Sequence, residues 1–567
     1  MKRAKWAGNG QRMLALSAAL LLCLLASACG KGEGGLPSGE NDSAWTETTR
    51  TAGASVSQNE EIVIGVAVDF TTMDPADTID TLSGGIQRMI MDGLFGFDDK
   101  MELMPMLATE YSANANATQY ELKLREGIRF SDGSPWNARA AKANLDRLTD
   151  ETLGLRRTTL LAGLVEQVDA ADEYTLRIRL TKPFGAFINT LAHPACVMMS
   201  PKQIEAGVEA CAKEAVGTGQ YIFKEWRKGE GLTVALNPDW WGYDAEISGG
   251  EALVDPDAGF KSVTFQPVTE GARRVSLLQS GELRAIWPVP SESYDVLVND
   301  DSLSTQSLEG IVVRYLFMNT AKEPFDDPRV RRAVNYAIDK EMYVDVAWDG
   351  LATVATSIIA PQVQFYQENS PYPLNVEKAK ALLAEAGYPE GFKSKLMCAN
   401  TTANVKQAEF LREQLAQIGV VVEIQSMENA LFNERTQDAG SEAEVEMTIS
   451  GWSPSTADAD WGIRPIVGAG SFPPNGHNLS YYDNQRVDAL LEEGLATADP
   501  ARRAAAYEAV QELIWADSPV VCLANDALTW SNSASVTDFR LFPDGALNMR
   551  NAKMYEQDTS KTRARYE

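Results

Sequence analysis

The stretch "KSKLMCANTTANVKQAEFLREQLAQIGVVVEI" (residues 393–424) consists of two short apolar runs on either side of a longer amphipathic segment. The runs at 393–399 and 420–424 have the length and the apolar character of buried strands. The segment between them carries apolar residues at helical spacing, namely Phe410, Leu411, Leu415 and Ile418. Gly419 follows, and glycine is the residue type that most often ends a helix. This order predicts a βαβ unit with parallel strands and a right-handed crossover, and therefore an α/β fold.

Two loops leave the predicted strand ends of this region. A third strand is predicted at 445–450, and the loop "GWSPSTADADW" (451–461) follows it. Ligands of open α/β sheets bind beyond the carboxyl ends of the strands, so both loops are candidate binding segments. The loop after residue 399 contains Asn400, Thr401 and Thr402 just before a predicted helix. Their amide and hydroxyl groups and the positive helix end suit a carboxylate.

The loop 451–461 offers groups of a different kind. Its two tryptophans can form apolar walls, and its two aspartates can accept hydrogen bonds from an amine. The alternative is that the aspartates form turns and the tryptophans pack into the core. The candidate ligand-binding residues of this loop are Trp452, Ser453, Ser455, Asp458, Asp460 and Trp461.

The first half of the chain mixes strands and helices without a clear repeat. "EIVIGVAV" (61–68) predicts a buried strand, and the loop after it contains Thr71, a further candidate ligand contact. Asn137 is a typical helix cap, with Leu145 and Leu148 on the inner face of the helix that follows. Alternating apolar residues predict strands at 120–124 and 173–180 and a hairpin at 221–237.

The N-terminus has the pattern of a secretory signal. Four positive residues precede the uncharged, mostly apolar run 13–28, which is shorter than the about 20 residues that span a membrane. Cys29 follows Ala-Ser-Ala directly, and this segment resembles a bacterial lipobox, with Ala26 where leucine is commoner. We therefore expect a diacylglycerol on Cys29 and a flexible stalk up to residue 59. The alternative is a simple secretory signal with an incidental cysteine.

Composition excludes some classes of partner. The formal net charge is −28, and removal of the signal, which carries four positive charges and no acid, makes it more negative by four. A chain this acidic is not expected to bind nucleic acid or anionic lipid surfaces. In an oxidising compartment Cys196 and Cys211 can form a disulfide, although two separate buried thiols fit the sequence equally well. Cys398 and Cys522 lie in apolar strand-like runs and are expected in the core.

The usual catalytic motifs are missing from this sequence. Its two histidines, His193 and His477, do not form a His-Glu-x-x-His motif, and there is no Cys-x-x-Cys, Gly-x-Ser-x-Gly, P-loop or Gly-x-Gly-x-x-Gly. We therefore expect no metal and no cofactor, and a structural role for His193 among its apolar neighbours. The 79 acidic residues leave glycosidase chemistry, which needs paired carboxylates, as an open alternative.

Eight segments, in this order, resemble family 5 of the extracellular solute-binding proteins, the peptide/nickel class that feeds ABC importers. The segments are "TMDPADTIDTLS", "GLFGFD", "LREGIRFSDG", "PFGAFINTLAHPA", "VGTGQYIFKEW", "MNTAKEPFDDPRVRRAVNYAID", "VEKAKALLAEAGYP" and "GWSPSTADADW". The resemblance runs from about residue 60 to about residue 555. Within the class, "FINTLAHPA", "GWSPSTADADW" and "NLSYYDNQRVDALLEEGLATADP" resemble the glutathione-binding members most.

The resemblance implies the two-lobed periplasmic-binding-protein fold, with an extra subdomain in lobe I, two interlobe crossings and a ligand cleft between the lobes. Hinge closure would bury the ligand, and a permease with cytoplasmic ATPases would read the closed form. The implied protein is a monomer that performs no covalent chemistry. The expected divisions are signal 1–28, stalk 29–59, lobe I 60–310 with its subdomain at about 105–215, lobe II 311–525, and a return segment with tail 526–567.

Two departures from the family bear on the ligand. Dipeptide-binding relatives hold the peptide amine with an aspartate three residues after the tryptophan of the Gly-Trp motif, and this chain has Ser455 there. They hold the peptide carboxylate with an arginine after the preceding strand, where this chain has Asn400 or Thr401. The glutathione-binding relatives also lack both anchors, so the departures favour glutathione or a similar small peptide.

Glutathione has two carboxylates, and arginine can bind a carboxylate bidentately. Arg464 and Arg314 are the first candidates for this role, and Arg88 is a weaker third. The alternative for Arg464 and for Arg314 is a surface or interlobe ion pair. The ligands that compete with glutathione are a general di- or oligopeptide, a nickel carrier and a haem-linked ligand. From another class, a surface peptidase or glycosidase on a similar scaffold remains. The expected location of the protein is the outer face of the cell membrane, either on a Gram-positive surface or in a periplasm.

Overall fold

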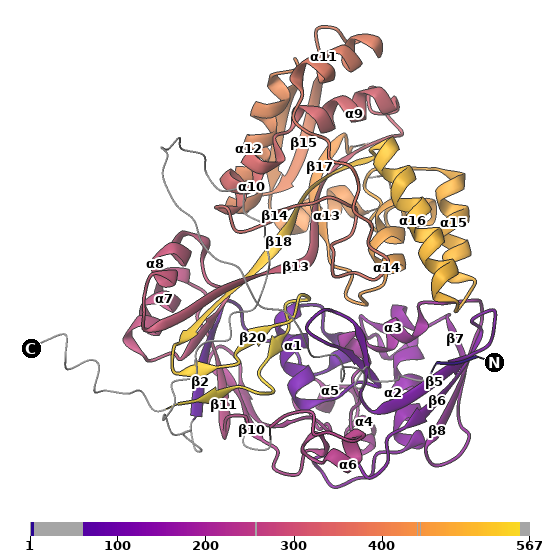
Figure 1. The fold of residues 1–567 in the computed structure, drawn as a ribbon, viewed down its shortest axis with the longest axis vertical. Coiled ribbons are helices and arrows are strands. Elements are labelled where there is room, and N and C mark those ends of the chain that lie inside the picture. The colour runs from indigo at the N-terminus through magenta and orange to yellow at the C-terminus, as the bar shows by residue number, and fades with distance from the viewer. Residues whose placement is uncertain are drawn as a thin grey trace, which may run out of the picture.

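The computed structural model describes residues 2–4, 61–255, 258–438, 440, 442 and 444–555. Figure 1 shows two lobes that are joined by two long strands, β13 (Leu303–Met318) and β18 (Val520–Ser533). The two strands pair antiparallel along most of their length. Lobe I contains the N-terminal half and lobe II the segment between β13 and β18. The lobe boundaries predicted near 311 and 526 remain predictions, and these positions lie inside the two strands.

One eleven-stranded sheet passes through both lobes. Its order is β16-β15-β17-β13-β18-β12-β2-β11-β10-β9, with β14 paired to β18. Its other strands are β2 (Glu61–Val66), β9 (Tyr221–Arg227), β10 (Gly231–Leu236), β11 (Ser262–Pro267), β12 (Ala285–Trp287), β14 (Thr353–Val354), β15 (Lys393–Ala399), β16 (Val421–Met427) and β17 (Met447–Trp452). The lobes are therefore continuous through β13 and β18, which pair with β17 in lobe II and with β12 in lobe I.

Lobe II confirms the predicted βαβ unit. β15 and β16 pair in parallel from Lys393 opposite Val421, and the helix α12 (Thr402–Ala416) connects them. The four apolar residues predicted for its inner face are buried, because they pack on the sheet. The other helices of this lobe are α9 (Pro328–Ala337), α10 (Lys340–Trp348), α11 (Val376–Glu385), α13 (Asn429–Gln437), α14 (Ala459–Val467), α15 (Gln485–Leu495) and α16 (Pro500–Asp517).

Lobe I carries a second, five-stranded antiparallel sheet in the order β1-β5-β6-β8-β7. Its strands are β1 (Lys2–Ala4), β5 (Ala108–Ala113), β6 (Gln119–Leu124), β7 (Val165–Ala170) and β8 (Thr175–Leu180). Small strand pairs are β3 (Phe95–Phe97) with β4 (Leu103–Pro105), β19 (Val536–Thr537) with β22 (Lys553–Met554), and β20 (Arg540–Leu541) with β21 (Leu547–Asn548). The helices of lobe I are α1 (Thr81–Ile90), α2 (Ala138–Thr149), α3 (Phe187–Leu191), α4 (Pro201–Glu205), α5 (Val208–Cys211), α6 (Ala245–Ser248), α7 (Gly271–Ser280) and α8 (Tyr294–Val298).

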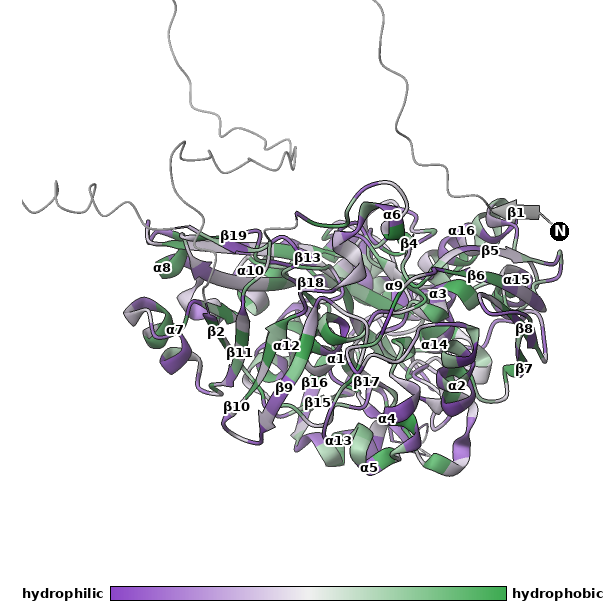
Figure 2. Ribbon diagram, turned by 90° about the horizontal axis from the view of Figure 1, so that it is seen from below, coloured by the Kyte–Doolittle hydropathy of each residue, from purple (hydrophilic) through white to green (hydrophobic). Residues whose placement is uncertain are grey.

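The local predictions for lobe I are confirmed where pattern and capping chemistry agree. The Asn137 side chain accepts hydrogen bonds from the first amides of α2, and Leu145 and Leu148 are buried below that helix. β9 and β10 form the predicted hairpin. In Figure 2 the interior strands are largely hydrophobic, whereas outer helices such as α4 and α7 carry many hydrophilic residues. Among the described residues, no helix is long and apolar enough to cross a membrane.

The two lobes also touch on the side away from the joining strands. The backbone N–H of Gly185 donates to the carbonyl oxygen of Leu495 at 2.8 Å, and Asn189 Nδ2 donates to the carbonyl oxygen of Thr456 at 3.2 Å. In Figure 1 this contact, near α3 and α14, lies on the opposite side of the interface from β13 and β18. The cleft between the lobes is therefore bridged at both sides.

Candidate ligand-binding cleft

A buried ion pair holds the loop that precedes α14. Asp458 is fully buried, and both of its carboxylate oxygens accept hydrogen bonds from the Arg503 guanidinium at 2.8 Å. Asp458 also caps α14 by accepting from the backbone N–H of Asp460. Arg503 lies on α16, so this pair anchors the loop 453–457 to a long helix of the same lobe. The loop therefore presents its side chains from a fixed frame.

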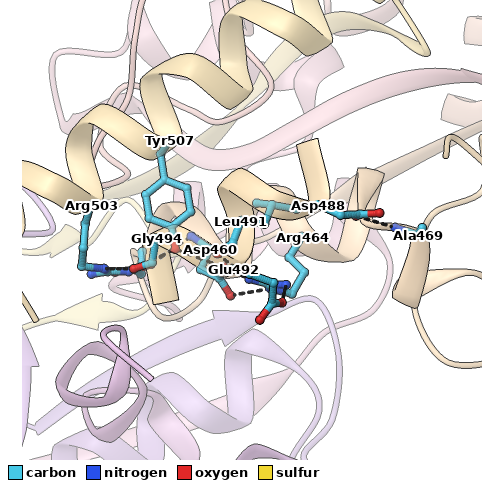
Figure 3. Close-up of polar contacts among 10 residues, drawn as sticks. Asp460, Arg464, Ala469, Asp488, Leu491, Glu492, Gly494, Arg503 and Tyr507 are labelled. Atoms are coloured by element: carbon cyan, nitrogen blue, oxygen red, sulfur yellow. Dashed lines mark hydrogen bonds and ion pairs between the residues drawn. The ribbon is translucent and has the colours of Figure 1, made fainter. Parts of the chain in front are cut away.

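A second group of polar contacts lies further along α14, and Figure 3 shows it together with Arg503. The Arg464 guanidinium binds the Asp460 carboxylate, with Nη2 at 2.8 Å from Oδ1, and reaches Glu492 at 2.7 Å. Tyr507 Oη donates to the same Asp460 carboxylate at 3.0 Å. Burial alone would lower the pKa of Arg464, but the Asp460 and Glu492 carboxylates raise it above its ordinary value. This network joins α14 to α15 and α16.

These contacts give internal partners to three of the residues that the sequence predicted to bind the ligand. Asp458 and Asp460 were expected to accept from a ligand amine, but arginines of their own lobe already bind them. Arg464 was expected to bind a ligand carboxylate, and Asp460 and Glu492 already pair with it. The physical reason is burial, because a desolvated charge needs a partner within the fold.

Arg314 is likewise engaged within the protein. Its Nε donates to both carboxylate oxygens of Asp526, at 2.8 and 3.0 Å, and its Nη2 donates at 2.5 Å. The guanidinium also lies 5.4 Å from the ring centre of Trp348. Arg314 and Asp526 lie on β13 and β18, so the pair fastens the two joining strands to each other. Arg314 thus has an ion-pair partner within the fold, and its contact with a ligand carboxylate stays a prediction.

A cavity of about 250 Å³ lies between the lobes. From lobe I it is lined by Pro75, Thr78, Ile79, Asp80, Thr81, Gly84, Gly85, Gln87, Arg88, Arg157, His193, Pro194, Ala195 and Asp544. From lobe II it is lined by Trp452, Ser453, Ser455 and Trp461. The cavity thus brings together residues that are several hundred positions apart in the chain.

The lobe II wall consists of residues that the sequence had indicated. Trp452 and Trp461 are half-buried, their ring centres are 5.9 Å apart, and Trp452 Nε1 donates to the carbonyl oxygen of Trp461 at 2.7 Å. This hydrogen bond fixes one indole against the other. Ser453 and Ser455 complete this wall. The described residues of lobe II that line the cavity thus supply aromatic faces and hydroxyl groups but no charge.

All the charged groups that line the cavity come from lobe I. Arg88 Nη2 lies 2.7 Å from the Asp544 carboxylate, so these two charges pair with each other. Arg157 Nε donates to the carbonyl oxygen of Thr78 at 2.8 Å. Asp80 caps α1 by accepting from the backbone N–H of Ser83. A ligand in this cavity would therefore meet two guanidinium and two carboxylate groups on one side only.

His193 lines the same cavity in its neutral form. Burial lowers the pKa of His193 to about 3, and the charges of Arg157 and Arg88 add to this effect. Its Nδ1 accepts a hydrogen bond from the backbone N–H of Ala195 at 3.0 Å, so the ring proton resides on Nε2. His193 thus has the structural role that the sequence predicted. The sequence did not predict that it also lines the cavity.

Several predicted site residues lie outside the cavity lining. Asn400, Thr401 and Thr402 are exposed, and Thr401 Oγ1 accepts from the backbone N–H of Asn404 as the cap of α12. Thr71 is exposed as well, and its Oγ1 donates to Asp80 Oδ2 at 3.3 Å. Thr71 therefore contacts a residue of the cavity lining, and Thr401 caps its own helix.

Sequence reasoning missed Asp80, Arg157 and Asp544 and gave Arg88 little weight. Asp80 could have been found, because it follows the first strand of the sheet and precedes a helix, where α/β folds place ligand contacts. Arg157 and Asp544 carry no such local signal. They reach the cavity only because folding brings their distant segments of the chain next to the start of α1.

The possible disulfide between Cys196 and Cys211 is absent, and both cysteines are free buried thiols. They belong to two different hydrophobic clusters, and Cys211 Sγ donates to the carbonyl oxygen of Gln203 at 3.4 Å. Cys398 and Cys522 lie in the core as predicted. Within the described part of the chain, no group of three His, Cys, Asp or Glu side chains is placed to hold a metal ion. His477 instead shares a hydrogen bond with Ser450, with Nε2 and Oγ 2.9 Å apart.

Sequence comparison relates this chain to known solute-binding proteins. The family model described as "Bacterial extracellular solute-binding proteins, family 5 Middle" matches residues 102–473. The glutathione-binding protein GsiB of Escherichia coli strain K12 is 36% identical over 497 residues, which covers 87% of this chain and 94% of that protein. The GsiB of Shigella flexneri matches to the same extent.

Solved structures have the same fold. HbpA2 from Haemophilus parasuis superposes with a TM-score of 0.77 at 25% identity, covering 87% of this chain and 100% of that one. The periplasmic binding protein DppA from Helicobacter pylori, solved in complex with the peptide STSA, superposes with a TM-score of 0.70 at 25% identity. That match covers 88% of this chain and 98% of DppA.

Proposed function

This chain belongs to family 5 of the bacterial extracellular solute-binding proteins, and we propose that it is the substrate-binding component of an ABC importer. It captures glutathione or a similar small peptide between its two lobes and delivers it to a membrane permease with cytoplasmic ATPases. The observation that carries this proposal is the interlobe cavity, with aromatic walls from lobe II and paired opposite charges from lobe I. Such a cavity suits a small zwitterionic ligand.

Glutathione is favoured over ordinary dipeptides by the lobe II wall. Dipeptide-binding relatives are expected to hold the peptide amine with an aspartate where this chain has Ser455, and Ser455 lines the cavity. A hydroxyl group there cannot replace the charge of a carboxylate. The full-length likeness to GsiB supports the same ligand class. The alternative is a general di- or oligopeptide receptor. The likeness to DppA, which was solved in complex with a peptide, supports this alternative.

The proposed role needs binding and closure but no covalent step. The free energy of ligand binding shifts the balance from open to closed lobes, and a ligand with weaker contacts closes them less often. The ligand should therefore be released unchanged. A peptidase or glycosidase on this scaffold would convert it instead.

Calorimetric titration of residues 60–567 tests the ligand. Carried-over ligand is first removed by partial unfolding and refolding, and the protein is then titrated with reduced glutathione, oxidised glutathione and a mixed dipeptide pool. We expect micromolar or tighter binding of a glutathione and none of the dipeptides. Mass spectrometry of the ligand after long incubation should find it intact.

Two results would contradict this proposal in different ways. If the protein binds dipeptides and neither form of glutathione, the transport role stands but the ligand is an ordinary peptide. Cleavage of the ligand would point to an enzyme.

We further propose that the protein is exported and held at the outer face of the cell membrane by a lipid on Cys29. The proposal rests on the signal-like run 13–28 and the small residues before Cys29, all of which lie outside the described residues. Cys29→Ala should move the protein from the membrane fraction to the soluble fraction or the medium, because one diacylglycerol supplies the anchor. Fractionation of cells that express each variant checks this. Detergent-sensitive membrane association that persists in Cys29→Ala would refute the lipid anchor.

A further inference from the structure

We propose that the cleft recognises a free amino-acid head group, an ammonium and a carboxylate on the same carbon atom, through Asp80 and Arg157 of lobe I. The inference rests on the proposed function, because it names the part of the proposed peptide ligand that this site would bind. It distinguishes a γ-glutamyl peptide such as glutathione, which has this head group, from an ordinary peptide, which does not.

Arg157 lines the cavity, and the two terminal nitrogens of its guanidinium group are available to a ligand. Its backbone N–H donates to the carbonyl oxygen of Ala76 at 2.9 Å, and its Nε donates to that of Thr78 at 2.8 Å. These two bonds hold the side chain against the segment that leads into α1. Among the described residues, Arg157 forms no ion pair and its two terminal nitrogens have no hydrogen-bond partner. They are available to a carboxylate in the bidentate geometry that guanidinium prefers.

Asp80 supplies the complementary charge two residues after Thr78. Its Oδ1 accepts from the backbone N–H of Ser83 at 2.8 Å, and its Oδ2 accepts from Thr71 Oγ1 at 3.3 Å. A carboxylate oxygen can accept more than one hydrogen bond, so both retain capacity for an ammonium. The residues that hold Arg157 and the residue that carries the anion therefore belong to one short segment. Both charged residues belong to the lobe I lining of the cavity.

The remaining charges near the cleft are already neutralised inside the protein. Arg88 pairs with Asp544, and the charged residues around the lobe II loop form the two internal pairs of Asp458 with Arg503 and Asp460 with Arg464. Arg157 and Asp80 thus remain as one cation and one anion for the ligand. A separate observation points to a ligand at the same wall. Gln87 lines the cavity, is 1% exposed, and its Oε1 has no hydrogen-bond partner among the residues that the structure describes.

The chemistry of the γ-glutamyl group matches this arrangement. In γ-Glu-Cys-Gly the peptide bond is made by the side-chain carboxyl, so the first residue keeps its ammonium and its α-carboxylate on one carbon. In α-Glu-Cys-Gly the α-carboxyl forms the peptide bond, and the remaining side-chain carboxylate is two carbons further away. An ordinary dipeptide has its two charges at opposite ends. The γ-linked ligand alone among these three carries an ammonium and a carboxylate on one carbon atom, as a site made of one guanidinium and one carboxylate would bind them.

Titration of the wild-type protein with γ-Glu-Cys-Gly and with its isomer α-Glu-Cys-Gly tests the inference without any substitution. The two ligands have the same composition and charge, so only the position of the carboxylate differs. We expect the γ-linked peptide to bind at least about tenfold more tightly. The loss of one charge-assisted hydrogen bond corresponds to about a tenfold to hundredfold loss of affinity.

Substitutions then assign the two residues. Asp80→Asn removes the charge and keeps the cap of α1, because asparagine caps as well as aspartate. Arg157→Lys keeps the charge and removes the bidentate fork. Each should weaken binding of γ-Glu-Cys-Gly about tenfold or more. The matched controls Asp77→Asn and Arg156→Lys change a neighbouring pair, 3.5 Å apart, that does not line the cavity, and should leave the affinity unchanged.

The outcomes separate this inference from the proposed function. Equal binding of both isomers, or unchanged affinity for γ-Glu-Cys-Gly in both Asp80→Asn and Arg157→Lys, overturns the head-group assignment while glutathione binding stands. Failure of the wild-type protein to bind γ-Glu-Cys-Gly at all overturns both. Discrimination between the isomers together with the two losses of affinity supports both.

Discussion

Replacement of Asp458 by asparagine is expected to lower the free energy of unfolding by about 3–5 kcal/mol, because it strands a buried charge. Arg503 would keep its hydrogen bonds to the Gly494 carbonyl oxygen and to Tyr507 Oη, at 3.1 and 3.4 Å, but lose its counter-ion. Its side chain is 5% exposed, so water cannot replace the carboxylate. Asparagine can still cap α14, so the loss reports the ion pair and not the cap.

Denaturant unfolding of the wild type and the variant measures this effect. Asp146→Asn is the matched control, because it removes an aspartate from the pair with Lys142 at 2.7 Å, in which both side chains are more than 40% exposed. That loss should stay below about 1 kcal/mol, since exposed pairs contribute little. The double variant Asp458→Asn with Arg503→Met should recover part of the stability by removing the stranded charge. Equal small losses in Asp458→Asn and Asp146→Asn would show that the buried pair contributes no more than an exposed one.

Gly185→Ala is expected to weaken ligand binding about tenfold or more without touching the ligand. A Cβ atom at Gly185 would lie 2.0 Å from the carbonyl oxygen of Thr497, across the contact between the lobes. Because the two residues belong to different lobes, the clash is relieved by opening the cleft. The closed form then becomes a smaller fraction of the population, and the apparent affinity falls in proportion.

Titration with the same ligand and solution scattering of the ligand-bound protein measure this prediction together. The variant should show a larger radius of gyration than the wild type at equal ligand concentration. Gly470→Ala is the control, because a Cβ at Gly470 meets no atom within 4 Å. Unchanged affinity and unchanged scattering in Gly185→Ala would mean that this contact is not part of closure.

The local architecture could be predicted from the sequence because its signals are local. The helix period between residues 402 and 416, the cap at Asn137 and the hairpin glycines at 229 and 231 each act within a few residues of the chain. Such patterns specify an element wherever it lies in the fold. The tryptophan loop was singled out because its place after a strand of an α/β sheet is a topological signal. It lines the cavity, and its contact with a ligand stays a prediction.

The roles of the charged residues were decided only by the tertiary structure. Asp458 finds Arg503 forty-five positions away and Arg314 finds Asp526 two hundred and twelve positions away, so nothing near either residue could show that it is already paired. Arg157 has no such partner among the described residues and lines the cavity. The sequence by itself determined the family, the α/β elements and the loop that lines the interlobe cavity. Which charges remain free for a ligand depended on distances through space, because an ion pair forms between side chains that folding brings within reach, however far apart they lie in the chain.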